Sequence, residues 1–232
     1  NAAADLVSDH VDSDTLRALG RPLSASVGAT PPIPLPPLGQ HVAVARDSAF
    51  AFSYEALQAG WRQAGAALSF FSPLADEAPD DDADAVYLPG GYPELHAGRL
   101  AANRTFLDGL RAAEQAGAWI YGECGGYMVL GEGLTDSAGE RHAMGGLLPL
   151  ETSFAAPRRR LGYREAMLLT DMPFAATGAQ FRGHEFHYAV VTQEGAAPPL
   201  FRCADSGGQD LGEVGTTVGK VFGSFIHLID SC

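Results

Sequence analysis

Residues 118–131 read AWIYGECGGYMVLG and contain the strongest local signal in the sequence. The apolar residues 118–121 predict a short buried strand, and a helix is predicted to begin near Met128. Small residues surround Cys124 between the two elements, so the chain can make a sharp, strained turn there. A strand that enters a helix through such a turn exposes the turn residue at the carboxyl end of a sheet, where ligands bind in doubly wound folds.

Strand and helix patterns alternate on the amino-terminal side of this turn. Short apolar strands are predicted at residues 41–45, 68–71 and 85–88, and helices are predicted at residues 52–64 and 100–115. This alternation indicates an α/β fold with a mostly parallel sheet and helices on both of its faces.

The pattern changes after about residue 145. The segments there are short and separated by turns, and they lie at residues 165–170, 180–182, 186–191, 200–202 and 218–222. We expect them to form antiparallel strands that extend the sheet or make a side layer. The carboxyl-terminal third is therefore predicted to be an antiparallel extension of the fold.

A proline-rich segment precedes this domain. Five of the seven residues from Pro31 to Pro37 are proline, which favours an extended, semi-rigid spacer. We therefore expect a linker over residues 29–39 and a globular domain over residues 40–232. Residues 1–28 have a weak helical pattern, and the chain does not begin with methionine, so we expect it to be a fragment of a longer protein.

Composition and charge exclude several classes of protein. The content of 46% hydrophobic and 19% charged residues is typical of a soluble globular protein, and no run of about 18 apolar residues predicts a membrane span. A net charge of −13 argues against nucleic-acid binding. The three cysteines are few and widely spaced, which disfavours a disulfide framework or a zinc site and predicts a cytoplasmic protein.

The turn residue Cys124 is a candidate nucleophile. It would lie at a helix amino terminus, whose dipole favours a thiolate, and the N–H of Gly125 would help to stabilise an oxyanion. A second glycine loop, residues 89–94, follows the strand at 85–88, and the N–H of Gly91 or Tyr92 is a candidate second donor. The alternatives are a buried structural cysteine and an ordinary turn.

A reactive thiolate needs a proton partner, which is usually a histidine. Of the seven histidines, His184, His187 and His227 lie in motifs of the carboxyl-terminal region, and the residues alone do not choose among them. The spacing of His184, Glu185 and His187 also resembles metal ligation, but no third ligand site is evident, and we expect no metal.

Several ordered motifs together resemble one family. They are VAVARD (42–47), FAFSY (50–54), LPGGYPE (88–94), GECGGYM (122–128), GGLLP (145–149), LGYR (161–164), GHEFHY (183–188) and GSFIH (223–227). From about residue 40 to 232 the chain resembles the carboxyl-terminal glutamine amidotransferase domain of cobyrinic acid a,c-diamide synthases, and it is most similar to the hydrogenobyrinic acid branch. The resemblance implies a class I glutamine amidotransferase-like, flavodoxin-like fold.

The resemblance also implies roles for single residues. Cys124 would be the nucleophile and His227 the histidine that activates it. The glutamate usual two positions after that histidine is Ile229 here, so Asp230 and Glu185 are the candidates for the group that orients His227. The glutamine often found four positions after the nucleophile is Met128, so the substrate contacts must differ, and Tyr92 and Tyr127 are candidate substrate-binding residues.

The implied activity is the hydrolysis of glutamine, with no cofactor in this domain. Ammonia would pass to an amino-terminal synthetase domain, which uses ATP and Mg²⁺ to amidate the a and c carboxylates of the corrinoid acceptor, and residues 1–28 would be the tail of that domain. The basic residues 158–160 would face that domain or the acceptor, or form a solvated loop. A cysteine hydrolase or peptidase and a non-catalytic regulatory module are the alternatives, and self-association into a homo-oligomer stays open.

Overall fold

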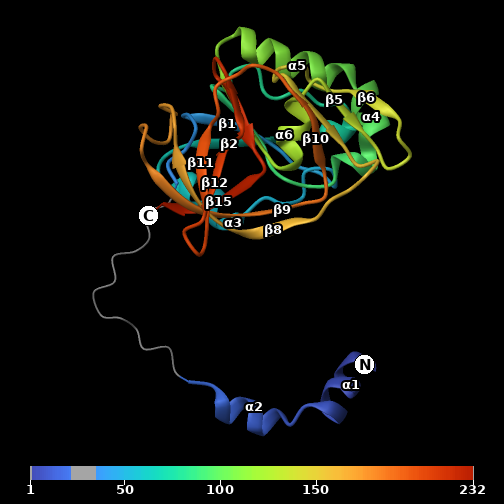
Figure 1. The fold of residues 1–232 in the computed structure, drawn as a ribbon, viewed down its shortest axis with the longest axis vertical. Coiled ribbons are helices and arrows are strands. Elements are labelled where there is room, and N and C mark those ends of the chain that lie inside the picture. The colour runs from blue at the N-terminus through green and yellow to red at the C-terminus, as the bar shows by residue number, and fades with distance from the viewer. Residues whose placement is uncertain (1, 22–34, 232) are drawn as a thin grey trace. The chain divides into compact units, whose positions relative to one another are not determined.

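The structure, a computed structural model, describes residues 2–21 and 35–231 (Figure 1). Contacts divide the chain into two units, residues 1–31 and residues 32–232. In the described ranges no helix is both long enough and apolar enough to cross a membrane.

The first unit consists of two short helices. Helix α1 (Ala2–His10) and helix α2 (Ser13–Leu19) have no buried residues, in keeping with the weak helical pattern of the sequence. The side chain of Asp12 caps α2 by accepting hydrogen bonds from the N–H groups of Asp14 and Thr15.

The end of the predicted linker belongs to the second, globular unit. Leu35 and Leu38 are buried, and the carbonyl of Leu35 accepts a hydrogen bond from Trp61 Nε1 at 3.0 Å. Burial of an apolar side chain contributes about 1.5–3 kcal/mol, which holds these leucines against the domain despite the prolines between them. The prediction of a spacer is therefore wrong for residues 35–39, and its residues 29–34 lie outside the described residues.

A six-stranded sheet forms the centre of the globular unit. Its order is β13-β14-β4-β3-β1-β2, and only β13 is antiparallel to its neighbour. The bounds are β1 (His41–Ala45), β2 (Ala67–Phe71), β3 (Ala85–Leu88), β4 (Trp119–Glu123), β13 (Thr216–Val218) and β14 (Val221–Ser224). Because β3 and β4 are neighbours, the loops that follow them meet at one edge of the sheet.

Helices cover both faces of this sheet, as predicted. One face packs against α4 (Ala97–Ala102), α5 (Arg104–Gln115) and α6 (Gly125–Leu130), and the other packs against α3 (Glu55–Gln63). Successive residues of β3 point to opposite faces, so Val86 and Leu88 join the first core while Tyr87 joins the second beside Trp61. Two short 3₁₀ helices, η1 (Pro73–Ala75) and η2 (Pro93–His96), lie in the connecting loops.

Helix α6 begins three residues before the predicted start. A Cβ atom on Gly126 would lie 1.9 Å from the carbonyl oxygen of Leu88, so a glycine is needed where the helix approaches β3. The glycines after Cys124 therefore serve helix-to-strand packing as well as the turn.

The carboxyl-terminal region forms the predicted antiparallel layer. Its five-stranded sheet has the order β12-β11-β8-β9-β15 and packs Phe181 and Phe201 into the core on the α3 side (Figure 1). The strands are β8 (Arg160–Leu168), β9 (Gln180–His187), β11 (Phe201–Asp205), β12 (Asp210–Val214) and β15 (Ile226–Ser231). Strand β14 ends at Ser224, opposite Glu123 of β4, and β15 begins two residues later, so the start of β15 lies at the carboxyl edge of the central sheet.

A smaller sheet completes the globular unit. It has the order β10-β7-β5-β6 and joins β5 (Gly133–Thr135), β6 (Arg141–Ala143), β7 (Leu150–Ser153) and β10 (Val190–Glu194).

Candidate active site

Cys124 occupies the strained turn that the sequence predicts. Its backbone has φ 51° and ψ −100°, and Asp76 is the one other non-glycine residue with positive φ in the described ranges. Two hydrogen bonds hold this conformation: Cys124 N donates to Ser224 O at 2.8 Å, and Cys124 O accepts from Met128 N at 3.2 Å. The side chain is 2% exposed. Such strain persists only where the surroundings fix it, and it is typical of a nucleophile elbow.

The loop after β3 lies directly against this turn. A Cβ atom on Gly125 would lie 2.9 Å from Gly91 N, and one on Gly91 would lie 2.0 Å from Ala49 O. In the part of the chain that the structure describes, neither Gly91 N nor Gly125 N donates to another backbone oxygen. Both N–H groups therefore lie beside the Cys124 turn, at the positions where the sequence predicts the oxyanion donors.

His227 is the histidine that reaches Cys124. It is 2% exposed, and a Cβ atom on Gly90 would lie 2.5 Å from its Cε1, so the loop after β3 encloses the ring. Burial lowers the pKa of His227, but its contacts with Cys124 and Glu123 and their negative charges outweigh burial and raise the pKa to about 10. A protonated imidazole beside a cysteine is the arrangement that stabilises a thiolate.

Glu123 is the acidic partner of His227, a role that no sequence motif predicted. Its Oε1 lies 3.1 Å from His227 Nδ1; the contact is a buried charge pair, since the ring N–H is not aligned for a regular hydrogen bond. The carboxylate, 1% exposed, also accepts hydrogen bonds from the hydroxyls of Tyr87 and Tyr121 and from Leu228 N. This network fixes Glu123 and, through it, the orientation of His227.

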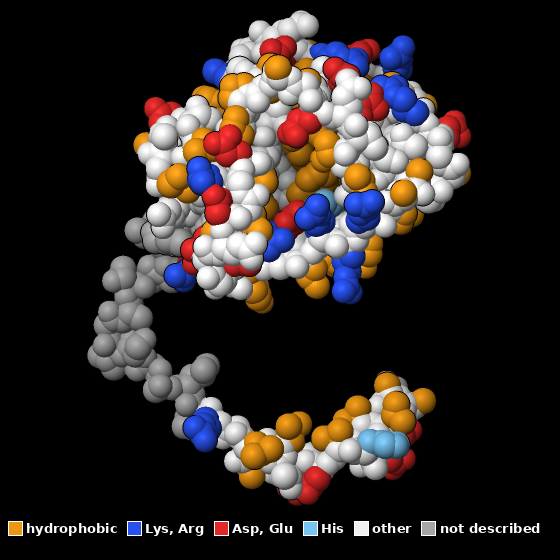
Figure 2. All heavy atoms as spheres, in the orientation of Figure 1, with side chains coloured by type: hydrophobic (Ala, Val, Ile, Leu, Met, Phe, Trp, Pro, Cys, Tyr) orange, Lys and Arg blue, Asp and Glu red, His pale blue; other side chains and the backbone are white. Residues whose placement is uncertain are grey.

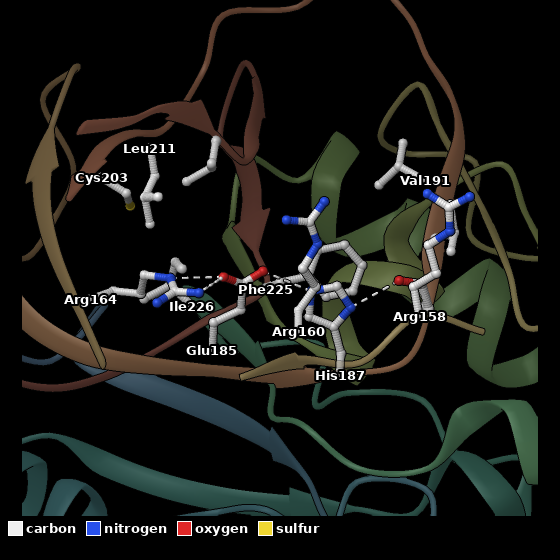
Figure 3. A pocket seen from close by; sticks show the side chains of 13 residues that line it. Arg158, Arg160, Arg164, Glu185, His187, Val191, Cys203, Leu211, Phe225 and Ile226 are labelled. Atoms are coloured by element: carbon white, nitrogen blue, oxygen red, sulfur yellow. Dashed lines mark hydrogen bonds and ion pairs between the residues drawn. The ribbon is translucent and has the colours of Figure 1, made fainter. Parts of the chain in front are cut away.

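Both residues expected to orient His227 make other contacts. Glu185 accepts hydrogen bonds from Arg164 Nε at 2.8 Å and pairs with His187 Nε2 at 2.8 Å, as Figure 3 shows. Asp230 accepts from the N–H of Ser231 near the end of β15. Ile229, at the usual glutamate position, is 56% exposed and has no polar group that could orient the ring. The expectation of Asp230 or Glu185 is corrected to Glu123.

The other two candidate histidines have different surroundings. The ring of His184 stacks on that of His227 with centroids 4.6 Å apart, and Tyr54 Oη lies 3.4 Å from His184 Nε2. Burial lowers the pKa of His184, and the charge of His227 adds to this effect while Glu123 opposes it. His187 is bound to Glu185 and to Ala189 O, and its ring stacks on Phe225.

A cavity of about 270 Å³ opens onto Cys124. Its walls are mainly aromatic and include Phe52, Gly91, Tyr92, Glu94, Cys124, Met128, Phe154, Phe186, His187 and Tyr188. Tyr92 lines this cavity and packs edge to face on Phe52. Tyr127 does not line it, because the side chain is buried and its hydroxyl hydrogen-bonds to Thr216 Oγ1. The expectation for Tyr127 is therefore wrong.

A second cavity, of about 400 Å³, lies on the other side of His187. Arg158, Arg160 and Arg164 line it together with the apolar side chains of β10, β12 and the β14–β15 turn (Figure 3). Figure 2 shows a hollow in the globular unit with apolar side chains inside it and basic and acidic side chains along its edge. Arg158 and Arg160, two of the three basic residues 158–160, thus line a cavity.

Cys203 and two acidic clusters are not part of this site. Cys203 is buried in β11, and burial raises the pKa of its thiol to about 12, while Cys232 lies outside the described residues. Two groups of described residues bring three potential metal-ligand atoms within 4.8 Å of one another, and neither includes a residue of the Cys124 site. These groups are His41, Asp80 and Asp82, and Asp136, Glu140 and His142.

The same region of the chain matches known proteins. Residues 41–231 match the family described as the CobB/CobQ-like glutamine amidotransferase domain. The hydrogenobyrinate a,c-diamide synthase of Brucella anthropi is 54% identical over 99% of this chain and 52% of the relative. That of a Sinorhizobium species is 55% identical over 99% and 52%. The chain spans about half the length of these curated relatives.

Solved structures share the fold. PurLQS from Thermotoga maritima has a TM-score of 0.58 at 21% identity, covering 81% of this chain and 86% of that one. A glutamine amidotransferase from the same organism has a TM-score of 0.52 at 15% identity, covering 81% and 75%. At these identities the likeness concerns the fold alone, and the family rests on the match of residues 41–231: the chain belongs to the CobB/CobQ-like glutamine amidotransferase domain family.

Proposed function

We propose that this domain hydrolyses the side-chain amide of glutamine through a thioester on Cys124. The observation that carries the proposal is the juxtaposition at one sheet edge of a strained cysteine, a buried protonated histidine and a buried carboxylate. A nucleophile, a proton carrier and an orienting group in contact are the parts that acyl transfer requires. The cavity beside Cys124, about 270 Å³ in volume, is large enough for an amino acid side chain.

The chemistry follows from these positions. The Cys124 thiolate attacks the amide carbon, and the oxygen gains negative charge that the N–H groups of Gly91 and Gly125 stabilise. His227 donates its proton to the departing nitrogen, and ammonia leaves as the C–N bond breaks. The neutral His227 then takes a proton from water, which attacks the thioester and releases glutamate and the thiolate. Glu123 keeps Nδ1 protonated, so that Nε2 exchanges protons with the reacting groups.

The proposal extends to the larger protein. Two relatives that this chain matches over about half of their length are named hydrogenobyrinate a,c-diamide synthases. We infer that ammonia passes to a synthetase domain that amidates the a and c carboxylates of hydrogenobyrinate or cobyrinate with ATP and Mg²⁺. Residues 1–28 would be the tail of that domain, and the protein would act in the cytoplasm.

The test compares ammonia release from glutamine by wild type and by Cys124→Ser. Each variant is measured as the chain alone and joined to a synthetase half, because an isolated glutaminase domain can be weakly active. We expect ammonia from wild type and none from Cys124→Ser. Cleavage of other amides or esters without glutamine hydrolysis would favour a cysteine hydrolase. No release by either variant in the joined protein would favour a non-catalytic module.

A further inference from the structure

Glutamine, the substrate of the proposed function, has two charged groups besides its amide. Its α-ammonium and α-carboxylate lose part of their hydration when the amide reaches the buried Cys124. A charged group that enters a largely apolar cavity needs an opposite charge or several hydrogen bonds to offset that loss. The cavity beside Cys124 is therefore expected to contain an acidic partner for the ammonium group.

Glu94 is the one acidic side chain among the described residues that line this cavity. It lies in η2, three residues after Gly91, and Pro93 of the same short helix would be 3.0 Å from a Cβ atom on Gly125. The carboxylate therefore projects from an element that packs on the nucleophile turn itself.

One oxygen of Glu94 has no partner within the protein. Its Oε2 is shielded from solvent, and no donor in residues 2–21 or 35–231 hydrogen-bonds to it. Burial raises the pKa of Glu94, which shows the cost of placing the carboxylate there without a counter-charge. A buried acceptor left unpaired destabilises a fold, so such a group in a cavity is typical of a binding site.

We propose that Glu94 binds the α-ammonium group of glutamine while Cys124 attacks the amide. The inference rests on the proposed function and adds a residue that selects α-amino acid amides over other amides. The ammonium supplies the donors that Oε2 lacks, and the resulting charge-assisted hydrogen bond is stronger than a neutral one.

Two other features of the cavity are weaker candidates for this role. The aromatic rings of Phe52, Phe154 and Phe186 can contact a cation through their faces, but such contacts leave Oε2 of Glu94 unpaired. His187, the basic residue of the lining, has both ring nitrogens engaged by Glu185 and Ala189. A carboxylate is the stronger and more specific ammonium partner.

The test uses glutamine and glutaramate, which is glutamine without its α-amino group. Dissociation constants are measured by calorimetry in a Cys124→Ser background, with the chain alone and joined to a synthetase half. We expect glutamine to bind about 10- to 100-fold more tightly than glutaramate, and Glu94→Gln to remove this difference by weakening glutamine alone. The matched control is Glu114→Gln, which removes an exposed acid of α5 and should preserve the ratio.

The outcomes separate this inference from the proposed function. If the protein with Glu94 intact binds glutamine and glutaramate equally well, the carboxylate does not bind the ammonium group. This outcome does not depend on the folding of a Glu94 variant. An unchanged ratio in a folded Glu94→Gln variant would overturn it as well. If neither compound binds, and wild type releases no ammonia even in the joined protein, the proposed function fails first and the inference fails with it.

Discussion

Replacing Glu123 with glutamine removes the charge that faces His227 and preserves the shape of the side chain. Glu123 Oε1 lies 3.1 Å from His227 Nδ1, and both side chains are almost fully buried. Unit charges about 4 Å apart interact by about 4 kcal/mol at an effective dielectric constant of about 20, which equals about three pH units. The pKa of His227 should therefore fall from about 10 to roughly 7 in Glu123→Gln.

The assay is an NMR titration of the His227 ring together with the turnover of glutamine. In wild type the ring should stay protonated past pH 9, since its pKa is about 10, and in Glu123→Gln it should titrate near neutral pH. The side-chain amide at position 123 of Glu123→Gln does not hold the His227 ring in one tautomer as a carboxylate does. The kcat for glutamine hydrolysis should therefore also fall by about 10²- to 10⁴-fold. The resonance is assigned by its absence in His227→Gln.

A matched control separates this effect from a general loss of buried charge. Glu185→Gln removes a partly buried carboxylate that pairs with Arg164 and His187, and the His227 titration should not change. Circular dichroism confirms that both variants fold. A His227 that titrates near 6.5 in wild type would rule out this role of Glu123, and so would a titration that shifts in Glu185→Gln and not in Glu123→Gln.

Two further predictions concern the titration of His227 and the roles of Tyr127 and Tyr92. The pKa of His227 is about 10 in the folded state and 6.5 in a free histidine, so between these pH values the folded state holds a proton that the unfolded state has lost. The protonated His227 therefore stabilises the fold fully below pH 6.5, and this stabilisation is lost as the pH rises through about 10. Urea unfolding from pH 6 to 10 should show this decline in wild type and a weaker one in His227→Gln, and equal slopes would contradict it. Tyr127→Phe should lower the free energy of unfolding by about 1 kcal/mol, since it removes the hydrogen bond to Thr216, and should leave the KM for glutamine unchanged, whereas Tyr92→Ala should raise KM. A raised KM in Tyr127→Phe would show that the residue contacts the substrate after all.

The sequence predicts the nucleophile turn because its signal is local. Cys124 stands among small residues between an apolar strand and a helix, and the strained φ of 51° follows from that pattern. The meeting of the Gly91 loop with the turn also follows, because parallel neighbouring strands end at one edge. The role of His227 could be assigned only from the family resemblance, since no local sequence signal distinguishes it from His184 and His187.

The side-chain directions at the site could not be predicted in this way. Glu123 directly precedes the nucleophile, and its role depends on β15 returning beside the end of β4, a contact between residues 105 positions apart. The position of the usual glutamate suggested Asp230 and Glu185, but the residue two positions after His227 faces solvent in β15. Tyr127 was misassigned because its direction depends on how α6 lies on the sheet, which a motif does not show.

The whole mechanism depends on the reactivity of Cys124, which a glutamine-like electrophile can probe. 6-Diazo-5-oxo-norleucine carries the amino acid end of glutamine and alkylates a thiolate that attacks its carbonyl, so peptide mapping after incubation identifies the nucleophile. We expect one label per chain, on Cys124, and we expect glutamine to suppress it in competition. Label on Cys203 or Cys232, or label on Cys124 that glutamine does not suppress, would contradict it.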